Sequence, residues 1–524
     1  MGFVVALVVA GAAGFIALSY EIIWYRVISY ASWGLPGAFG LLLAAYLLGL
    51  AIGSRVAGRF CTDDKAGNAK VLRSLAAFTF FANVVAWLVV PVFGWVSKLW
   101  DWPPALAAVI VAAGLLGAIL PLVAHFGIKP DDRAGVNLSY VYLANIIGSS
   151  AGSLITGFVF FDAFTLQTTS MIVACLGMVL VAALVLLSDL GGSGRSSGVV
   201  ATLVAGVLFV KLTPVAYDRI WERLQWKTTL EEDTRFLDVV ETKSGVVAVT
   251  KEKMVFGGGA YDGKVSTSLR WDSNGIFRAY GVGAMHPAPK NVLMIGLATG
   301  AWAQVVSQIP GVEKLTVVEI NPGYLQLIGK YDEVKSLLTN PKVEIVIDDG
   351  RRWLNRHPES RFDVVVMNTT WNWRAHSTNL LSVEFLELAR SRLAPGGILY
   401  FNSTSSDDVQ FTAATVFPHA LRVWNFVAVS DSPFSWDKQR WKNLVETMKL
   451  DGEPVVDVND PDNAQFFADT YAYPDTVNGP YDREGLESRD NILKRTTAEG
   501  AKLITDDNMV PEWRKVLRFQ DPTH

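Results

Sequence analysis

The chain of 524 residues is 51% hydrophobic and carries 46 basic and 50 acidic side chains, a formal net charge of −4. Its mean hydropathy of +0.28 excludes an ordinary soluble enzyme, and its length allows two domains. The charge is divided unevenly: residues 1–216 hold 11 basic and 8 acidic side chains, and the remainder holds 35 and 42. This acidic remainder argues against nucleic acid as a partner, because phosphate binding needs a basic face.

The two cysteines, Cys61 and Cys175, lie in a polar loop and inside an apolar run. They support neither a disulfide framework nor a thiolate metal site. No spacing of His, Cys, Asp and Glu matches a set of metal ligands either, so we predict no metal.

Residues 1–216 contain about seven apolar runs of roughly 18 to 25 residues, long enough to cross about 30 Å of hydrocarbon. The runs begin near Gly2, Gly37, Ser74, Pro104, Leu138, Thr168 and Gly198. The first run lacks the basic segment of a signal peptide, so we predict that it is retained. This part is therefore predicted to be a multi-pass α-helical membrane domain, with the lipid bilayer as its partner.

Polar and small residues mark two places in these runs. Glu21 and Arg26 lie where the first run leaves the bilayer, in a segment rich in Trp and Tyr. They suit either an interfacial anchor or a polar site that faces a ligand. Small residues fill Gly148–Ser153, where they favour close packing of helices.

Basic residues in the short loops give an orientation, because they concentrate on the cytoplasmic side. The side of the N-terminus carries Arg55, Arg59, Lys65, Lys70, Arg73, Lys129, Arg133 and Arg195, and the opposite side carries Arg26 and Lys98. This asymmetry places the N-terminus in the cytoplasm. Seven crossings then place the soluble part of the chain outside the cytoplasm.

Residues 217–290 are predicted to form an amphipathic linker and a small β-subdomain. The linker, Tyr217–Lys227, is rich in Trp and suits the membrane surface. Short strand-like segments follow at Phe236–Val240, Gly245–Thr250 and Lys253–Phe256, and the turn residues Gly257–Gly263 close the set.

From residue 291 to residue 524 the pattern alternates between strands and helices. Strands are predicted at Val292–Ile295, Leu315–Val318, Val343–Ile347, Asp363–Val366 and Ile398–Asn402, with helices from Ala301, from Pro322 and over Val383–Leu393. Alternation of this kind predicts a parallel, doubly wound α/β sheet of the Rossmann-like type.

Small and acidic residues follow three of these strands. Gly296, Ala298 and Gly300 lie in a loop between a strand and a helix, where small residues let a nucleoside approach the backbone. Glu319 ends the next strand, where a carboxylate can bind both ribose hydroxyls. Asp348 and Asp349 end the third strand, where an acid can bind the amino group of an adenine. The three strand ends predict a nucleoside cleft or a vestigial site of the same shape.

Residues Val292–Asn402 resemble the core of the polyamine aminopropyltransferase (spermidine synthase) family. The whole chain is similar to bacterial proteins in which such a domain follows a membrane-spanning half. The motifs that carry the resemblance are Tyr20–Arg26, Tyr142–Asn145, His286-Pro287, Asp349–Arg352, Asn379-Leu380, Glu384-Phe385, Thr505–Asn508 and Glu512.

The resemblance implies a fold of the S-adenosylmethionine-dependent transferase type in the cytoplasmic (inner) membrane of a bacterium. It implies that Glu319 binds the ribose, and that Asp348 and Asp349 flank the adenine. The cofactor would be decarboxylated S-adenosylmethionine, S-adenosylmethionine or methylthioadenosine, and the ligand a polyamine or another small molecule. The predicted outside location is awkward for a domain whose relatives use a cytosolic nucleoside.

The chain departs from the family at the positions that carry its chemistry. Thr299 stands where the family has an aspartate that holds the charged end of the aminopropyl donor. The segment Asn368–Asn372 stands where the family has a loop with two catalytic aspartates. Asn368 can orient an amine but cannot take its proton. Trp371 and Trp373 can attract a cation but supply no base. The tyrosine and acids that precede His286-Pro287 in the family are not recognisable.

Other side chains are candidates to replace the missing acids. Asp262 lies in the Gly-rich segment, and Asp506, Asp507 and Glu512 lie near the C-terminus. All of them also suit solvated loops or helix caps. His376 is a candidate base or an ordinary exposed histidine. A pair of arginines, Arg351 and Arg352, is predicted to pair with neighbouring carboxylates.

Three classes of function follow from the sequence. The first is a membrane-anchored transferase with an S-adenosyl-type nucleoside cleft that is not an ordinary spermidine synthase. The second is a catalytically lapsed domain that acts as a structural or regulatory subunit, with membrane or envelope proteins as partners. The third is a transporter of polyamines or small molecules with a sensing domain, for which Pro121 and Asn145 are the only signs inside the apolar runs.

Overall fold

The computed structural model describes residues 2–61, 67–188, 190–272, 274–368, 371–471 and 485–514. The chain forms two compact units. Unit 1 comprises Met1–Trp33, Gly37–Phe236 and Glu241–Gly245, and unit 2 comprises Gly34–Pro36, Leu237–Val240 and Val246–His524. The finer boundaries at residues 217 and 291 stay predictions.

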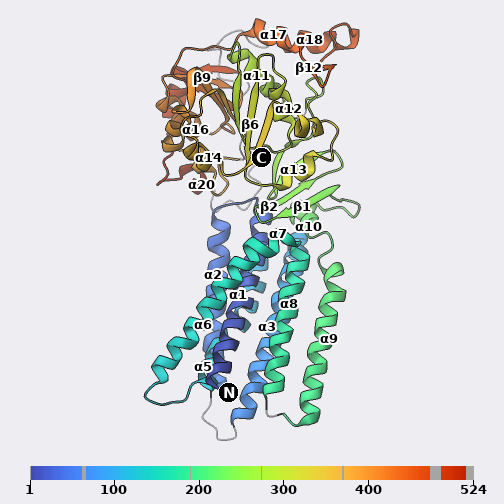
Figure 1. Cartoon of the computed structure of the whole chain (residues 1–524), viewed down its shortest axis with the longest axis vertical. Coiled ribbons are helices and arrows are strands. Elements are labelled where there is room, and N and C mark those ends of the chain that lie inside the picture. Colours follow the sequence, from blue (N-terminus) through green and yellow to red (C-terminus); the bar gives the residue numbers. More distant parts are fainter. Residues whose placement is uncertain are drawn as a thin grey trace. The chain divides into compact units, whose positions relative to one another are not determined.

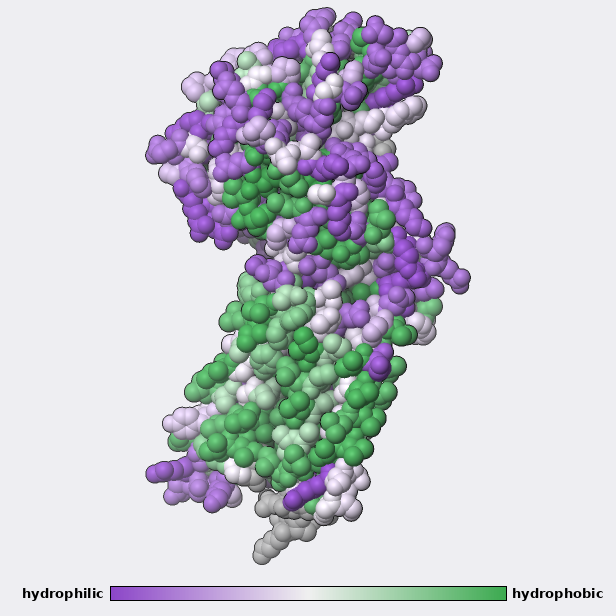
Figure 2. Space-filling model, turned by 45° about the vertical axis from the view of Figure 1, so that its right-hand side comes forward, coloured by the Kyte–Doolittle hydropathy of each residue, from purple (hydrophilic) through white to green (hydrophobic). Residues whose placement is uncertain are grey.

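Seven helical segments in unit 1 are long and apolar enough to cross a membrane, which confirms the seven predicted runs. They span Phe3–Ala31, Gly37–Phe60, Leu72–Trp100, Pro103–Gly127, Ala134–Ala163, Leu166–Leu187 and Gly192–Ala216. The helices lie alongside one another in a bundle (Figure 1). Hydrophobic residues cover the face of the bundle that Figure 2 shows.

Two of the seven segments are interrupted. The fourth consists of α4 (Leu106–Gly117) and α5 (Ile119–Gly127), separated by Ala118. Pro121 lies in the first turn of α5, where a helix loses no internal hydrogen bond to a proline. The fifth passes from α6 (Ala134–Leu154) through a π-helical turn (Ile155–Phe160) into the short helix α7 (Phe161–Ala163).

The first helix, α1 (Phe3–Ala31), packs closely against α6 through small residues. A Cβ atom on Gly148 would lie 1.9 Å from the carbonyl oxygen of Gly11, and one on Gly152 would lie 2.2 Å from that of Phe15. The Asn145 amide donates a hydrogen bond to the carbonyl of Ala10 at 3.1 Å. The predicted packing role of the small residues is therefore confirmed, and Asn145 takes part in the same seam.

Arg26, near the end of α1, binds backbone carbonyl groups outside its own helix. Arg26 donates to the carbonyl oxygens of Thr242 (2.6 Å) and Lys243 (3.2 Å), and its guanidinium lies 3.8 Å from the ring centroid of Phe161. Among the described residues, no ion pair joins Arg26 to Glu21. Arg26 instead ties α1 to a turn that is distant in sequence.

A four-stranded sheet with the order β1-β2-β3-β4 occupies the region after α10 (Ile220–Trp226). Its strands are β1 (Asp238–Thr242), β2 (Gly245–Val249), β3 (Met254–Gly257) and β4 (Ala260–Lys264). The predicted turn Gly257–Gly263 is too long. Only Gly258 and Gly259 form the turn, both with positive φ as a tight hairpin requires, and Asp262 therefore lies on a strand.

The main sheet of unit 2 has eight strands in the order β14-β10-β11-β9-β8-β5-β6-β7. The parallel strands are β5 (Asn291–Ile295), β6 (Lys314–Glu319), β7 (Val343–Ile347), β8 (Phe362–Met367) and β9 (Leu393–Asn402). The predicted doubly wound sheet is confirmed. It is extended by antiparallel strands that were not predicted, namely β10 (His419–Val423), β11 (Phe426–Ser430) and β14 (Leu486–Ser488).

Successive residues of a strand point to opposite sides of the sheet, so both faces carry apolar side chains. Helices cover both faces and bury these side chains. Val292 and Met294 join a core with α11 (Phe277–Met285), α12 (Ala301–Ser307) and α13 (Gly323–Ile328). Leu293 and Ile295 join a second core. The helices of that core are α14 (Gly350–Arg356), α15 (Val383–Arg390), α16 (Asp407–Val416) and α19 (Arg489–Ala498). In Figure 1, α14 and α16 lie on one side of β6, and α12 and α13 lie on the other.

Candidate functional site

The candidate site lies at the carboxyl ends of the parallel strands, where the strand order reverses. The first strand, β5, pairs with β6 on one side and with β8 on the other. The residues that follow or end neighbouring strands are Gly296 after β5, Glu319 at the end of β6, Asp348 after β7 and Asn368 after β8. Open α/β sheets bind their ligands at such a switch point.

The loop from β5 to α12 needs small residues for its backbone. Gly296, Ala298 and Gly300 have φ angles of +91°, +46° and +78°. A Cβ on Gly296 would lie 3.4 Å from the carbonyl oxygen of Asn368, and one on Gly300 would lie 2.9 Å from Ile328. The positive φ angles at Gly296 and Gly300, which side chains rarely allow, are therefore what requires glycine in this loop.

The Glu319 carboxylate is held by hydrogen bonds from backbone N–H groups, one of them in this loop. Its Oε2 accepts a hydrogen bond from the Leu297 N–H, and its Oε1 accepts one from the Asn321 N–H, both at 2.7 Å. Burial raises the pKa of Glu319, the two backbone donors oppose that shift, and the nearby Asp262 carboxylate adds to it. The Ala298 N–H is a further backbone donor to Glu319. A carboxylate has about four lone-pair sites, so acceptor capacity beyond these backbone donors remains for the ribose.

The two acids after β7 both have partners within their own helix. Asp349 caps α14 by accepting a hydrogen bond from the Arg352 N–H at 2.7 Å. Asp348 pairs with Arg352 and, at 3.4 Å, with Arg356. Burial favours the neutral form of Asp348, but the arginines and the Asp349 N–H outweigh it and lower the pKa. Both carboxylates remain half-buried at the edge that Glu319 shares.

Asp262 comes to the same edge from β4. Its carboxylate accepts a hydrogen bond from the Tyr324 hydroxyl of α13, and it is close enough to Glu319 to affect the pKa of that residue. Burial raises the pKa of Asp262, whereas the Arg374 guanidinium and the Tyr324 hydroxyl lower it less strongly. This half-buried carboxyl group is a candidate to bind or deprotonate an amine.

The segment after β8 places aromatic rings beside Asp262. The Trp371 Nε1 donates to the carbonyl of Tyr261 at 3.2 Å, and the rings of Trp371 and Trp373 stack with centroids 6.1 Å apart. Asn372 donates to the Thr404 hydroxyl. Two residues of the predicted loop, Thr369 and Thr370, lie outside the described residues.

The C-terminal acids support other parts of the fold. Asp506 pairs with Arg351 at 2.6 Å and accepts a hydrogen bond from the Ser382 hydroxyl at 2.6 Å, and Arg351 lowers the pKa of Asp506. Asp507 is exposed. The structure thus brings Asp262 to Glu319 and pairs Asp506 with Arg351 of α14, and it confirms that Arg351 and Arg352 pair with carboxylates.

Glu512 holds the segment that contains His376. Its carboxylate accepts hydrogen bonds from the N–H groups of His376 (3.0 Å) and Thr378 (2.9 Å) and from the Thr378 hydroxyl. Glu512 is buried, with 2% of its surface exposed. Its position therefore suits a structural anchor for the chain that follows the site.

Sequence reasoning missed two side chains of the site, Tyr324 and Arg374. Tyr324 follows the predicted helix start at Pro322, and Arg374 lies against Gly258 of the β3–β4 turn. Neither belongs to a motif with a chemical signature. Their role depends on contacts between segments that are more than 60 residues apart, for which a single sequence gives no signal.

The sheet, its switch point and the small-residue loop define a Rossmann-like domain with a ligand site at the carboxyl edge. Residues 280–416 match the family model of the spermine/spermidine synthase domain. The C-terminal part of the chain therefore contains a spermidine synthase domain, and the resemblance seen in its motifs is confirmed.

Curated relatives are named polyamine aminopropyltransferases. One from Desulforudis audaxviator is 31% identical over 147 residues, 26% of this chain and 53% of its own length. Polyamine aminopropyltransferase 2 of Streptomyces coelicolor is 27% identical over 407 residues, 73% of this chain and 70% of its own length. One from Mycobacterium tuberculosis is 32% identical over 126 residues, 23% of this chain and 24% of its own length. The chain thus spans about half of the first relative and a quarter of the third.

Solved spermidine synthase structures also superpose on the chain. One in complex with the transition state analogue AdoDATO is 17% identical and covers 45% of this chain and 88% of its own, with a TM-score of 0.35. Another, from Thermotoga maritima, is 16% identical and covers 45% of this chain and 87% of its own, with a TM-score of 0.34.

Proposed function

We propose that the protein is a membrane-anchored, spermidine synthase-like protein that binds an S-adenosyl-type nucleoside and does not carry out ordinary spermidine synthesis. The observation that carries the proposal is the position of Glu319. Its carboxylate is fixed between the Leu297 and Asn321 N–H groups at the switch point, beside a loop of small residues. Decarboxylated S-adenosylmethionine, S-adenosylmethionine and methylthioadenosine all carry the ribose diol that such a carboxylate binds.

Asp348 and Asp349 support the adenine end of the same site. Their strand lies next to the strand that ends in Glu319, so an adenine bound at Asp348 or Asp349 is within reach of a ribose bound at Glu319. The arginine partners of Asp348 keep it ionised, and an ionised carboxylate accepts the hydrogen bonds that the amino group of adenine donates.

The acceptor side of the site supports a reaction other than the usual one. Asn368 follows β8 and can orient an amine, but an amide takes no proton at neutral pH. Asp262 is the half-buried acid beside Glu319 and Tyr324, and we assign it the task of holding or deprotonating the acceptor.

Nucleoside binding is tested by calorimetry on the purified full chain in detergent with methylthioadenosine. We expect measurable binding, a loss of roughly tenfold or more in affinity for Glu319→Ala, and no change for Glu344→Ala. Glu344 is a matched control because it lies on β7, pairs with Lys314 at 2.8 Å and is more than half exposed. Absence of binding by the wild-type chain would overturn the proposal.

Catalysis is tested with decarboxylated S-adenosylmethionine and a set of amines, with product detected by mass spectrometry. We expect no spermidine from putrescine, and robust formation of spermidine would contradict the proposal. Binding without transfer to any amine would instead support a lapsed domain that serves an envelope assembly. The amide at Asn368 is the observation that favours this second candidate.

A further inference from the structure

The Arg278 guanidinium, in the first turn of α11, has only neutral hydrogen-bond partners. Its Nε donates to the Gly275 carbonyl and its Nη2 to the Asn274 carbonyl, both at 2.8 Å. Its Nη1 donates to the side-chain oxygen of Asn425. Among the described residues, Arg278 forms no ion pair with a carboxylate.

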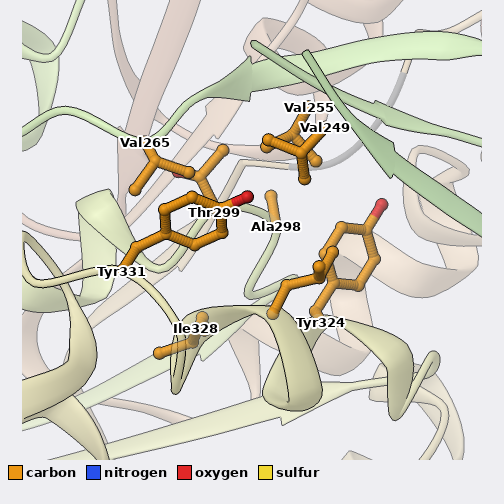
Figure 3. A pocket seen from close by; sticks show the side chains of 9 residues that line it. Val249, Val255, Val265, Ala298, Thr299, Tyr324, Ile328 and Tyr331 are labelled. Atoms are coloured by element: carbon orange, nitrogen blue, oxygen red, sulfur yellow. The ribbon is translucent and has the colours of Figure 1, made fainter. Parts of the chain in front are cut away.

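The loop before α11 lies at the carboxyl edge of the main sheet. Asn274 of this loop accepts a hydrogen bond from the Tyr261 hydroxyl of β4 at 2.7 Å. A Cβ on Gly263 would lie 3.1 Å from the Asn274 amide nitrogen and 3.3 Å from the Thr299 methyl group. Val265, which follows β4, also lies beside Thr299 (Figure 3). The loop that holds the guanidinium therefore borders the β5–α12 loop.

On its other side, Arg278 is connected to the ends of β8 and β9. Asn425 donates to the side-chain oxygen of Asn402, the last residue of β9, at 3.3 Å. The same oxygen accepts the Thr404 N–H at 2.8 Å, and the Thr404 hydroxyl accepts a hydrogen bond from Asn372 of the segment after β8. A chain of neutral groups thus joins Arg278 to the acceptor side of the site.

The surroundings of Arg278 offset its charge only in part. Burial lowers the pKa of Arg278, and Tyr400 and Asp272 oppose this less strongly. The Asp272 carboxylate accepts three backbone N–H groups from residues 274–277 at 2.9–3.0 Å and does not bind the guanidinium. A half-buried cation without a bound counterion is costly, so an anion bound at Arg278 would be favourable.

The guanidinium also retains the donors that a carboxylate needs. Its three hydrogen bonds leave one N–H on each terminal nitrogen. Two parallel N–H groups match the two oxygens of a carboxylate. The Arg278 Cζ lies 4.9 Å from the ring centroid of Phe426 and 5.9 Å from that of Trp302, and these rings help to fix its position.

We infer that Arg278 binds a carboxylate of the acceptor, so that the acceptor is an amino acid rather than a diamine. The inference rests on the proposed function, in which Asp262 holds the acceptor amine, and it adds the chemical class of the acceptor. A diamine would place its second ammonium near the Arg278 guanidinium, and like charges repel.

The test compares three amines that differ only at the far end. The probes are 4-aminobutanoate, putrescine and butylamine, which end in a carboxylate, an ammonium and a methyl group. Calorimetry uses the full chain in detergent at neutral pH with saturating methylthioadenosine. We expect the wild-type chain to bind 4-aminobutanoate about tenfold or more tightly than either other amine.

Variants of Arg278 separate binding from the support of its own loop. Arg278→Gln should bind 4-aminobutanoate about tenfold more weakly and lose the preference over butylamine, whereas Arg278→Lys keeps the charge and should retain the wild-type order. Arg361→Gln is the control. Arg361 is exposed, precedes β8 at the opposite edge of the sheet, and donates only to the carbonyls of Pro358 and Ser360 at 2.8 Å. It should bind all three amines as the wild-type chain does.

The outcomes separate this inference from the proposed function. Equal or tighter binding of putrescine by the wild-type chain, or binding of none of the three amines, overturns the inference while binding of methylthioadenosine upholds the nucleoside site. An unchanged preference in Arg278→Gln overturns the assignment to this residue. Absence of methylthioadenosine binding overturns the proposed function, and the inference with it. If Arg278→Gln does not fold, the wild-type order and Arg278→Lys decide.

Discussion

Burial and hydrogen bonding act on the Glu319 carboxyl group in opposite directions. Burial favours the neutral acid, and the backbone N–H groups of Leu297, Asn321 and Ala298 favour the carboxylate. Burial dominates, so the pKa is raised above the ordinary 4.5. The residue that is proposed to bind the ribose therefore loses its charge at a higher pH than an exposed glutamate does.

The affinity for methylthioadenosine should follow this pKa. Only the ionised form accepts hydrogen bonds from both ribose hydroxyls, so affinity is full above the raised pKa and declines as the pH falls through it. The decline begins at a pH above 4.5. Glu319→Gln should bind roughly tenfold or more weakly at neutral pH and show no such decline. Calorimetry across pH measures both, and an identical decline in the variant would rule out Glu319 as its source.

Asp262 gives a prediction about stability. Its pKa is raised in the folded protein above the ordinary 3.8 because of burial. The folded state therefore holds the proton more tightly, and its contribution is full below pH 3.8 and is lost as the pH rises through the raised pKa. Asp262→Asn does not titrate, and its amide oxygen still accepts the Tyr324 hydrogen bond.

The melting temperature of Asp262→Asn relative to wild type should thus increase between pH 4 and pH 7.5. The expected increase is roughly 3–5 °C for each unit by which the pKa of Asp262 is raised. Tryptophan fluorescence on heating measures it in detergent. Asp507→Asn, at an exposed position, is the control and should follow wild type at every pH. A pH-independent difference for Asp262→Asn would contradict the raised pKa.

The sequence predicted those parts of the site whose residues lie close together in the chain. Glu319 was recognisable because it ends a strand about twenty residues after a small-residue loop. The partners of Asp262 and of Asp506 were not, because Tyr324 and Arg351 reach them across 62 and 155 residues. Such pairings depend on how helices and strands pack, and no spacing rule encodes them.

Among the elements, the α1–α6 pair depends most directly on side-chain size. A Cβ on Gly148 would lie 1.9 Å from the Gly11 carbonyl oxygen, a backbone atom that cannot move without displacing the whole helix. Gly148→Ala should destabilise the bundle by about 1–3 kcal/mol, because an overfilled contact must open.

Gly135, on the same helix, is the matched control because nothing lies within 4 Å of its Cβ position. Gly135→Ala should be neutral or stabilising by up to about 1 kcal/mol, since alanine favours a helix. Thermal unfolding in detergent compares the two variants. Equal effects would show that α1 and α6 do not pack through this seam.

Periodicity predicted most elements but not all of their ends. Hydrophobic length gave the seven apolar helices, and alternation gave the parallel strands. The turn after β3 was predicted too long because Gly257, Gly258, Gly259 and Gly263 read together as one loop, although only two of them form the turn. The antiparallel strands β10 and β11 were missed. They are joined by Trp424 and Asn425, which carry no glycine or proline signal.

At the scale of the whole molecule, the distribution of basic loops predicts the orientation in a bilayer. Paired reporters, one active only in the cytoplasm and one only outside it, should report the outside when they are fused to the C-terminus. The same pair fused after Arg133, four apolar segments from the start, should report the cytoplasm. A cytoplasmic C-terminus would contradict the predicted orientation, and it would give the nucleoside site access to a cytosolic donor.

The close contact at Gly148 also restricts which single-nucleotide substitutions in its codon preserve the packing of α1 on α6. Every single-nucleotide substitution that alters a glycine codon to another amino acid introduces a residue with a Cβ atom. At Gly148 each of those residues would place its Cβ against the Gly11 carbonyl oxygen, so every missense change of this codon is expected to weaken the contact between α1 and α6. We therefore expect natural variation to bypass this codon while the exposed positions of the same helix drift freely.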